Sequence, residues 1–238
     1  MKSCLRILVI VLLAGVVASA QQPAPAAQKP VSGDLKSVLA QMNANAAKFK
    51  SAEADFELET YESVVQEKTV QKGHIYFRRN IKTGEVQAAF DITSPAHKQV
   101  VFKDGKIFMY EPNINQITER NVSQNKAAVE AFLSLGFGAR GDDLRKDYDV
   151  TLAGWEIVDR FNTAKLELVP HNERLRQTYS KIILWIDPEQ DVLLQQQFLE
   201  SSGNYRLTRY TRLKVNGNIP DSAFQIKTKG KTQTVQSQ

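Results

Sequence analysis

A hairpin that is apolar on both faces constrains this chain more than any other feature. Two β-rich runs flank Asp104-Gly105, a dipeptide that favours the positive φ angles of a tight turn. With this turn, Val101 lies opposite Phe108 on one face of the hairpin. Phe102 then lies opposite Ile107 on the other face. A sheet with one wet face alternates apolar and polar residues, so this hairpin must be covered on both sides.

The first twenty residues have the pattern of a signal peptide. Lys2 and Arg6 form a basic start, an apolar run follows at residues 7–17, and Ala18-Ser19-Ala20 is typical of a cleavage site. The apolar run is shorter than the ~20 residues that span a bilayer. We therefore predict cleavage after Ala20, with an uncleaved anchor as the alternative.

Residues 21–32 are rich in proline, alanine and glutamine and predict a flexible linker. Residues 33–238 predict a single domain, because the mature length of 238 − 20 = 218 residues suits one large all-β domain. Loss of residues 1–20 would lower the net charge from +5 to +3, since they hold two basic residues. Charges of both signs are interspersed, so the sequence does not predict a nucleic-acid partner.

Strand patterns fill most of the domain, with two helical segments. Asp34 is a suitable N-cap, and apolar residues recur at helical spacing from Leu35 to Phe49. About eleven strand segments follow between Asp55 and Val215. A second helical segment, which Ser123 could cap, interrupts them at residues 123–137.

These elements predict a mainly β fold, a half-open antiparallel barrel of about 11 strands, because a flat open sheet of that size curls or splits. Either helical segment could cover the second face of the hairpin. We also expect a polar loop at residues 171–177 and a frayed tail after Gly230. Periodicity leaves open whether the interior is a filled core or a ligand cavity.

Several motifs resemble, in order and spacing, those of the LolA-type periplasmic carriers of outer-membrane lipoproteins. The matching pieces extend over nearly the whole mature chain and comprise Leu35–Phe49, Gly73–Arg79, Pro95, Asp104–Pro112, Gln116, Leu168–Pro170, Ile182–Asp187 and Asn216–Phe224. The chain departs from the family pattern at Asn80, where proline is usual, and at Phe108, where the type member has tryptophan. It also lacks the Pro-rich C-terminal ending.

The resemblance implies a half-open barrel closed by a helical lid over an apolar cavity that receives lipoprotein acyl chains. It implies that residues 123–137, hereafter the lid, close the cavity and that Arg79 latches the lid in the ligand-free state. Periplasmic localisation, an inner-membrane lipoprotein-releasing transporter and an outer-membrane acceptor are also implied. We expect a monomer that carries acylated lipoproteins or lipids.

Apolar side chains on the strands and in the lid are the candidates for lining such a cavity, with ordinary core packing as the alternative for each one. They are Phe77, Phe90, Val101, Phe108, Tyr110, Phe132, Leu135, Phe137 and Phe198.

Catalytic motifs are weak in this sequence. His74, His97 and His171 are scattered, and the only cysteine, Cys4, lies in the predicted signal peptide. Residues 136–141 spell G-x-G-x-x-G, but they follow a helical pattern in an all-β chain, whereas the dinucleotide motif requires a βαβ unit. We therefore predict no enzyme activity, no cofactor and no metal. The alternatives to a lipoprotein carrier are a carrier of another lipid, an envelope adaptor that senses lipid or protein, and a secreted enzyme.

Overall fold

The structure is a computed structural model that describes residues 33–80, 82–135, 137–190, 192–228, 230 and 232–237. These residues belong to one compact unit. The predicted signal peptide and linker, residues 1–20 and 21–32, lie outside the described residues. Within the described ranges, no helix has both the length and the apolar character needed to cross a membrane.

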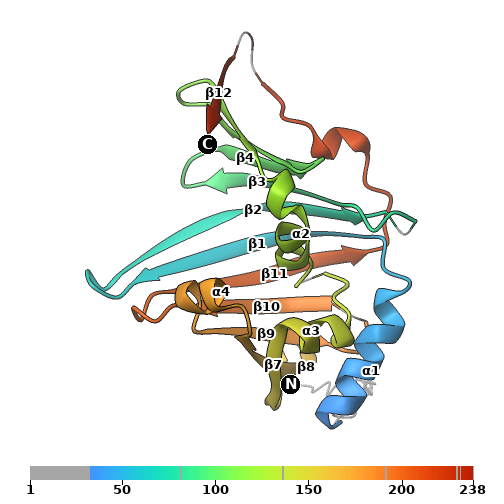
Figure 1. Ribbon diagram of the computed structural model, residues 1–238. Coiled ribbons are helices and arrows are strands. Elements are labelled where there is room, and N and C mark those ends of the chain that lie inside the picture. Colours follow the sequence, from blue (N-terminus) through green and yellow to red (C-terminus); the bar gives the residue numbers. More distant parts are fainter. Residues whose placement is uncertain are drawn as a thin grey trace, which may run out of the picture. The chain divides into compact units, whose positions relative to one another are not determined.

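One twelve-stranded sheet forms the body of the unit, with strands in the order β12-β6-β5-β4-β3-β2-β1-β11-β10-β9-β8-β7 (Figure 1). The strands are β1 (Ser51–Glu62), β2 (Glu67–Arg79), β3 (Val86–Ser94), β4 (Lys98–Lys103), β5 (Lys106–Glu111), β6 (Gln116–Asn121), β7 (Tyr148–Val158), β8 (Phe161–Pro170), β9 (Lys181–Asp187), β10 (Val192–Leu199), β11 (Tyr205–Val215) and β12 (Gln233–Ser237). The helical segments are α1 (Leu35–Ala46), η1 (Ser123–Asn125), α2 (Lys126–Ser134), α3 (Gly141–Asp147), α4 (Glu173–Thr178) and η2 (Asp221–Phe224).

The first strand, β1, pairs with both β2 and β11, so strands from early and late in the chain lie side by side at the middle of the sheet. All of the strand pairs are antiparallel except that of β12 with β6. The sheet ends at β12 on one side and at β7 on the other and does not close. The prediction of a mainly β, half-open barrel is therefore confirmed.

The hairpin of β4 and β5 has the predicted register. Val101 pairs with Phe108 and Phe102 with Ile107. Asp104 and Gly105 both have positive φ angles, +54° and +70°, as a tight hairpin turn requires. The local sequence was sufficient for this prediction because turn chemistry and alternation determine the register of a short hairpin.

The two faces of the hairpin have different covers. Phe102 packs into the main core, on the face that we call the inner face, which also meets the lid. Val101 packs on the other face, the outer face, with Ile219 and Phe224. The prediction that the hairpin is covered on both sides is correct, but neither helical segment supplies the outer cover. It comes from the chain around η2, which follows β11.

Helix α1 lies away from the β4–β5 hairpin, near the end of the sheet that holds β8 and β9 (Figure 1). Asp34 caps it as predicted, since its carboxylate accepts a hydrogen bond from the Ser37 amide at 2.8 Å. The helix packs against α3, and a Cβ at Gly141 would lie 2.5 Å from the Leu39 carbonyl oxygen. Glycine at this position therefore permits the close contact of the two helices.

Two segments that were expected to be irregular are ordered. Residues 173–178 form α4 because the Asn172 side chain caps the helix, accepting a hydrogen bond from the Leu175 amide at 3.0 Å. The tail forms β12, which extends along the otherwise unpaired edge of β6, where Gln233 pairs with Gln116. An open strand edge offers a row of backbone donors and acceptors, which explains why a polar tail is held there.

The predicted N-cap of the lid is also corrected. Ser123 begins a 3-10 turn, and neither Val122 nor Asn125, the N-cap residues of η1 and α2, forms a capping side-chain hydrogen bond. The Ser123 hydroxyl donates instead to the Gly105 carbonyl at 3.4 Å. The start of the lid is therefore attached to the turn of the β4–β5 hairpin.

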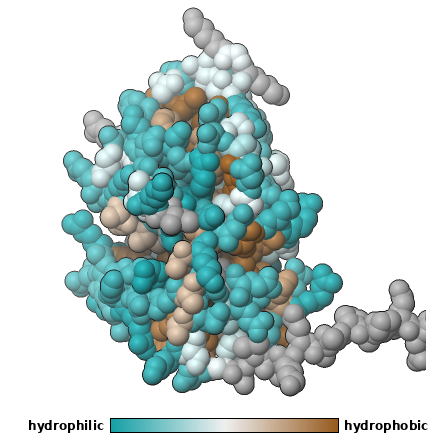
Figure 2. All heavy atoms as spheres, turned by 90° about the vertical axis from the view of Figure 1, so that its right-hand side faces the viewer, coloured by the Kyte–Doolittle hydropathy of each residue, from teal (hydrophilic) through white to brown (hydrophobic). Residues whose placement is uncertain are grey.

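Apolar side chains are gathered between the sheet and its covers. Figure 2 shows a largely hydrophilic surface in which hydrophobic residues appear in the recesses between polar ones. Among the described residues, the exposed large hydrophobic side chains include Val64, on the β1–β2 turn, and Ile157, on the edge strand β7. The main apolar cluster lies between the inner face, α1, the lid and α3.

Candidate ligand-binding cavity beneath the helical lid

A cavity of about 160 Å³ lies between the inner face and the lid. It is lined by Phe56, Leu58, Gln71, Ile75, Phe90, Ile92, Phe132, Leu133, Phe137, Gln196, Phe198, Thr208 and Tyr210. Its volume resembles that of an engineered apolar cavity of about 150 Å³ that admits benzene. Pockets for larger ligands start at about 300 Å³. In this conformation the cavity has room for a small apolar group but is smaller than the usual pocket for a larger ligand.

The central strands supply most of the wall. In β1 and β11, Phe56 pairs with Tyr210 and Leu58 with Thr208. Leu58 also pairs with Gln71 of β2. Because side chains at alternate positions point to the same face, these residues all face the lid.

Aromatic rings join the lid to the sheet. The centroid of the Phe132 ring lies 5.2 Å from that of Phe198 and 6.2 Å from that of Tyr179. The Phe137 ring lies 5.7 Å from Phe77 and 5.2 Å from Tyr210. Ring pairs at these distances contribute about 0.5–1.5 kcal/mol beyond their burial, so the C-terminal half of the lid is held by packing.

Arg79, at the end of β2, contacts the chain immediately after the lid. Its Nη1 donates to the Gly138 carbonyl oxygen at 2.8 Å, and its guanidinium carbon lies 5.9 Å from the centroid of the Phe49 ring. Gly138 has a φ of +67°, and a Cβ there would lie 2.4 Å from Phe49 Cδ1. Only glycine therefore presents its carbonyl to Arg79 without displacing the phenylalanine.

The remaining polar contacts of the lid are exposed or long. Lys126 Nζ lies 3.0 Å from Glu85 Oε1, and both side chains are 36% exposed. Glu130 accepts a hydrogen bond from the Val86 amide at 3.3 Å. Exposed ion pairs contribute between nothing and about 1 kcal/mol. The lid is therefore joined to the sheet mainly by apolar packing and by the bond from Arg79.

The cavity wall contains a few polar groups. The Gln196 amide donates to the Tyr210 hydroxyl at 2.8 Å. Burial raises the pKa of Tyr210, although hydrogen bonds with Thr208 and Gln196 oppose this effect. The phenol is therefore neutral at physiological pH, and the wall carries uncharged donors and acceptors within an apolar surface.

Among the predicted cavity residues, Phe90, Phe132, Phe137 and Phe198 line the cavity. Phe77 lies on the same face but is buried in the core, in contact with Phe137.

Other predicted positions lie elsewhere. Leu135 is buried where the lid turns towards Leu144 of α3. Val101 and Phe108 pack on the outer face with η2. Tyr110 shares that face by alternation, and its hydroxyl donates to Asn115 at 3.2 Å. The placement of these three residues in the inner cavity is thus corrected, because the chain around η2 provides an apolar partner for the outer face.

Sequence reasoning missed several wall residues, namely Phe56, Leu58, Gln71, Ile75, Ile92, Leu133, Gln196, Thr208 and Tyr210. The alternation of Phe56 and Leu58 with charged residues in β1 was a signal that could have found two of them. The polar members of the set come beside them through strand pairing: Thr208 and Tyr210 on β11, Gln71 on β2 and Gln196 on β10.

The three histidines lie apart from this cavity. Each has a ring nitrogen close to an aspartate oxygen, at 2.8 Å for His74, 2.8 Å for His97 and 3.0 Å for His171. In the part of the chain that the structure describes, no group of three or more His, Cys, Asp or Glu side chains is arranged to hold a metal ion.

Sequence comparisons find similarity to a protein family and to proteins that are named as carriers. Residues 95–237, more than half of the chain, match a family model whose description is "Uncharacterized protein". The outer-membrane lipoprotein carrier protein of Bordetella avium is 26% identical over 185 residues, which cover 77% of this chain and 80% of that protein. The protein of the same name from Methylobacillus flagellatus is 26% identical over 155 residues, which cover 65% and 67%.

Among solved structures, MucB resembles this chain with a TM-score of 0.54 and a sequence identity of 18%. The alignment covers 87% of this chain and 67% of MucB. MucB in the Pseudomonas aeruginosa MucA/MucB complex has a TM-score of 0.50 at 18% identity and covers 82% of this chain. This chain spans 62% of the length of MucB there, less than two thirds. At this identity the likeness shows a shared fold.

Proposed function

Because the chain belongs to the family whose model matches residues 95–237 and is LolA-like in sequence and fold, we propose that it is a periplasmic carrier of outer-membrane lipoproteins. It would bind their acyl chains in the cavity beneath the lid and transfer them from the inner to the outer membrane. The observation that carries this proposal is the small apolar cavity closed by a weakly held lid.

The energetics suit a lid that opens for an acyl chain. Each buried CH₂ group contributes about 0.8 kcal/mol. The hydrogen bond from Arg79 to Gly138 joins a charged donor to a carbonyl, a type worth about 1.5–3 kcal/mol. Burial of a few methylene groups therefore offsets the loss of this bond, while the bond closes the cavity again after release.

Arg79→Leu tests the proposal. We expect this variant to retain its fold and to bind acyl cargo, but to hand it to an acceptor more slowly than the wild type, because the closed state loses its latch and no longer favours release. Native mass spectrometry before and after delipidation measures bound acyl chains, and transfer of a labelled lipoprotein to an acceptor membrane measures release.

Arg145→Leu is a suitable control, because Arg145 is an exposed arginine on α3. Transfer by Arg79→Leu at the wild-type rate would refute the latch. Failure of the purified wild-type protein to take up an acyl chain in any form would refute the proposed carrier function.

The second candidate function is an envelope adaptor on the same scaffold. It is favoured by the likeness to MucB, which forms a complex with MucA. An adaptor would bind a protein partner without passing cargo to an acceptor, so the transfer assay separates the two functions.

A further inference from the structure

The inner face changes in character along β11, from the cavity outward. Tyr210 lies against apolar residues, Thr208 follows at the next inward-facing position, and Arg206 follows after that. Successive positions on one face of an antiparallel strand are about 6.8 Å apart, so Arg206 lies about 14 Å from Tyr210 along the strand. The surface thus passes from apolar to hydroxyl to cation within the length of a small molecule.

Neighbouring strands extend the middle position into a polar row. Thr208 pairs with Gln196 of β10 and with Leu58 of β1, which pairs in turn with Gln71 of β2. All four residues line the cavity. Among the described residues, no side-chain hydrogen bond engages the Gln71 amide, so its donors are available to a ligand carbonyl.

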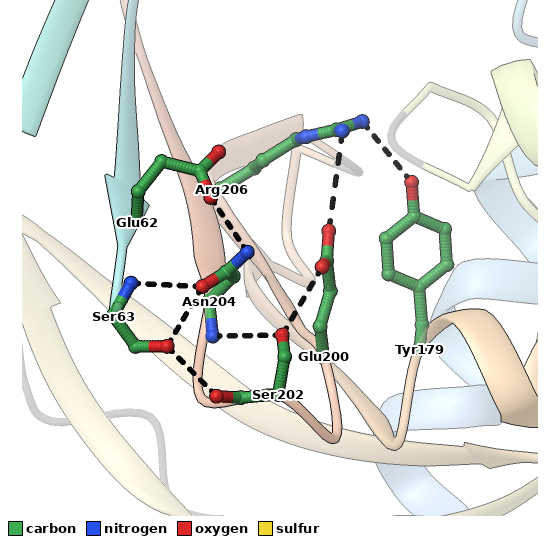
Figure 3. Close-up of polar contacts among 7 residues, drawn as sticks. All are labelled: Glu62, Ser63, Tyr179, Glu200, Ser202, Asn204 and Arg206. Carbon is green, nitrogen blue, oxygen red and sulfur yellow. Dashed lines mark hydrogen bonds and ion pairs between the residues drawn. The ribbon is translucent and has the colours of Figure 1, made fainter. Parts of the chain in front are cut away.

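A third row, still on the inner face but farthest from the apolar wall, carries the cation. Arg206 pairs with Thr60. Its Nη1 donates to the Tyr179 hydroxyl at 3.2 Å, and its Nη2 lies 3.9 Å from Glu200 Oε1. Figure 3 draws both contacts. The Arg206 side chain is 51% exposed. A guanidinium has five N–H donors, so these contacts leave donors for an incoming anion.

Carboxylates lie just beyond this row. Glu62 and Glu67 pair with each other at the last position before the β1–β2 turn, on the same face as Arg206 by alternation. Glu62 accepts a hydrogen bond from the Asn204 amide at 2.7 Å (Figure 3). Glu200 lies beside the guanidinium, and Glu62 and Glu67 lie one inward-facing position beyond Thr60, the partner of Arg206. This negative charge disfavours a ligand that carries only negative charge.

We propose that the cavity takes a glycerophospholipid with a zwitterionic head group, in which a phosphate precedes an ammonium; the proposal rests on the proposed function of acyl-chain binding. Its acyl chain lies against the apolar wall, and its ester carbonyls accept from the polar row of Gln71, Gln196 and Thr208. Its phosphate contacts Arg206, and its ammonium contacts Glu62 and Glu67. A free fatty acid has no ester group and no second charge with which to match these rows.

Head-group competition tests this assignment. A phosphatidylethanolamine with a fluorescent acyl chain is bound to the purified, delipidated protein and displaced by lipids with identical acyl chains. The competitors are phosphatidylethanolamine, phosphatidylglycerol, diacylglycerol and the free fatty acid. We expect phosphatidylethanolamine to compete about tenfold better than phosphatidylglycerol, the difference that one additional charge contact provides.

Substitutions test which part of the lipid each row of side chains contacts. Arg206→Gln should weaken phosphatidylethanolamine binding about tenfold and leave diacylglycerol binding unchanged. Arg209→Gln is the matched control, because Arg209 is on the same strand but faces outward, 3.8 Å from Glu57. Glu62→Gln with Glu67→Gln should remove the preference over phosphatidylglycerol. Tyr179→Phe keeps the guanidinium and should keep the preference, which separates head-group binding from loosening of the lid.

Two results would overturn the inference in distinguishable ways. Equal competition by all the lipids, or a preference for the free fatty acid, would refute head-group recognition while leaving acyl-chain binding intact. Absence of binding by every lipid, diacylglycerol included, would refute both this inference and the proposed function.

Discussion

Replacement of Gly138 by alanine should release the lid, and the cost can be derived from the structure. Gly138 has a φ of +67°, a conformation that costs an L-residue about 1–2 kcal/mol. The new Cβ would lie 2.4 Å from Phe49 Cδ1, well inside the ordinary carbon contact of about 3.5–4.0 Å. Phe49 is only 3% exposed, so its ring has little room to move away.

The backbone at residue 138 must therefore shift, which weakens the hydrogen bond from Arg79. Overpacking of this kind costs about 1–3 kcal/mol. Together with the backbone strain, we expect Gly138→Ala to lower the free energy of unfolding by about 2–5 kcal/mol.

Gly84→Ala is a matched control, because Gly84 has a φ of +73° and a Cβ at this position would meet no neighbouring atom within 4 Å. It should lose only the strain contribution of about 1–2 kcal/mol. Urea unfolding monitored by tryptophan fluorescence measures both losses, provided that the dependence on urea is unchanged. Equal losses in the two variants would refute the reasoning that Phe49 forces a glycine at residue 138.

Further predictions concern the two covers of the sheet and one histidine. Phe224→Ala should lower the free energy of unfolding by about 3–4 kcal/mol, because Phe224 is 2% exposed on the outer face, and should leave acyl-ligand affinity unchanged in a displacement assay. Phe132→Ala should lower the free energy of unfolding by less, because Phe132 is only partly buried. It should also speed the uptake of a fluorescent acyl probe, because Phe132 lies between the cavity and the solvent side of the lid. The pKa of His171 should lie above its usual 6.5 in an NMR titration, because the Asp149 carboxylate and the Lys146 carbonyl contact its ring, and Asp149→Asn should lower it. Since the folded-state pKa is raised, this stabilisation is complete below pH 6.5 and is lost as the pH rises through the raised value; an unshifted titration would contradict it.

Local chemistry made part of the fold predictable. The register of the β4–β5 hairpin follows from its turn dipeptide and from alternation over six positions on each side, so Val101 and Phe102 were correctly assigned to opposite faces. The start of α1 follows from one side chain, Asp34, and its contact three residues later. Arg79 was singled out by the resemblance, and its bond to Gly138 is a contact that the sequence alone could not specify.

Long-range pairing decided the remainder. Alternation separates the two faces of a strand, but it does not reveal which face meets the lid, because the covers come from distant parts of the chain. Val101 and Phe108 were assigned to the cavity, yet they pack with Phe224, which lies more than a hundred residues further along. The pairing of β1 with β11 places Thr208 and Arg206 beside the apolar wall, so the polar rows of the cavity exist only in the folded sheet. Such contacts depend on the closure of long loops and on the burial of whole surfaces, which no short stretch of sequence encodes.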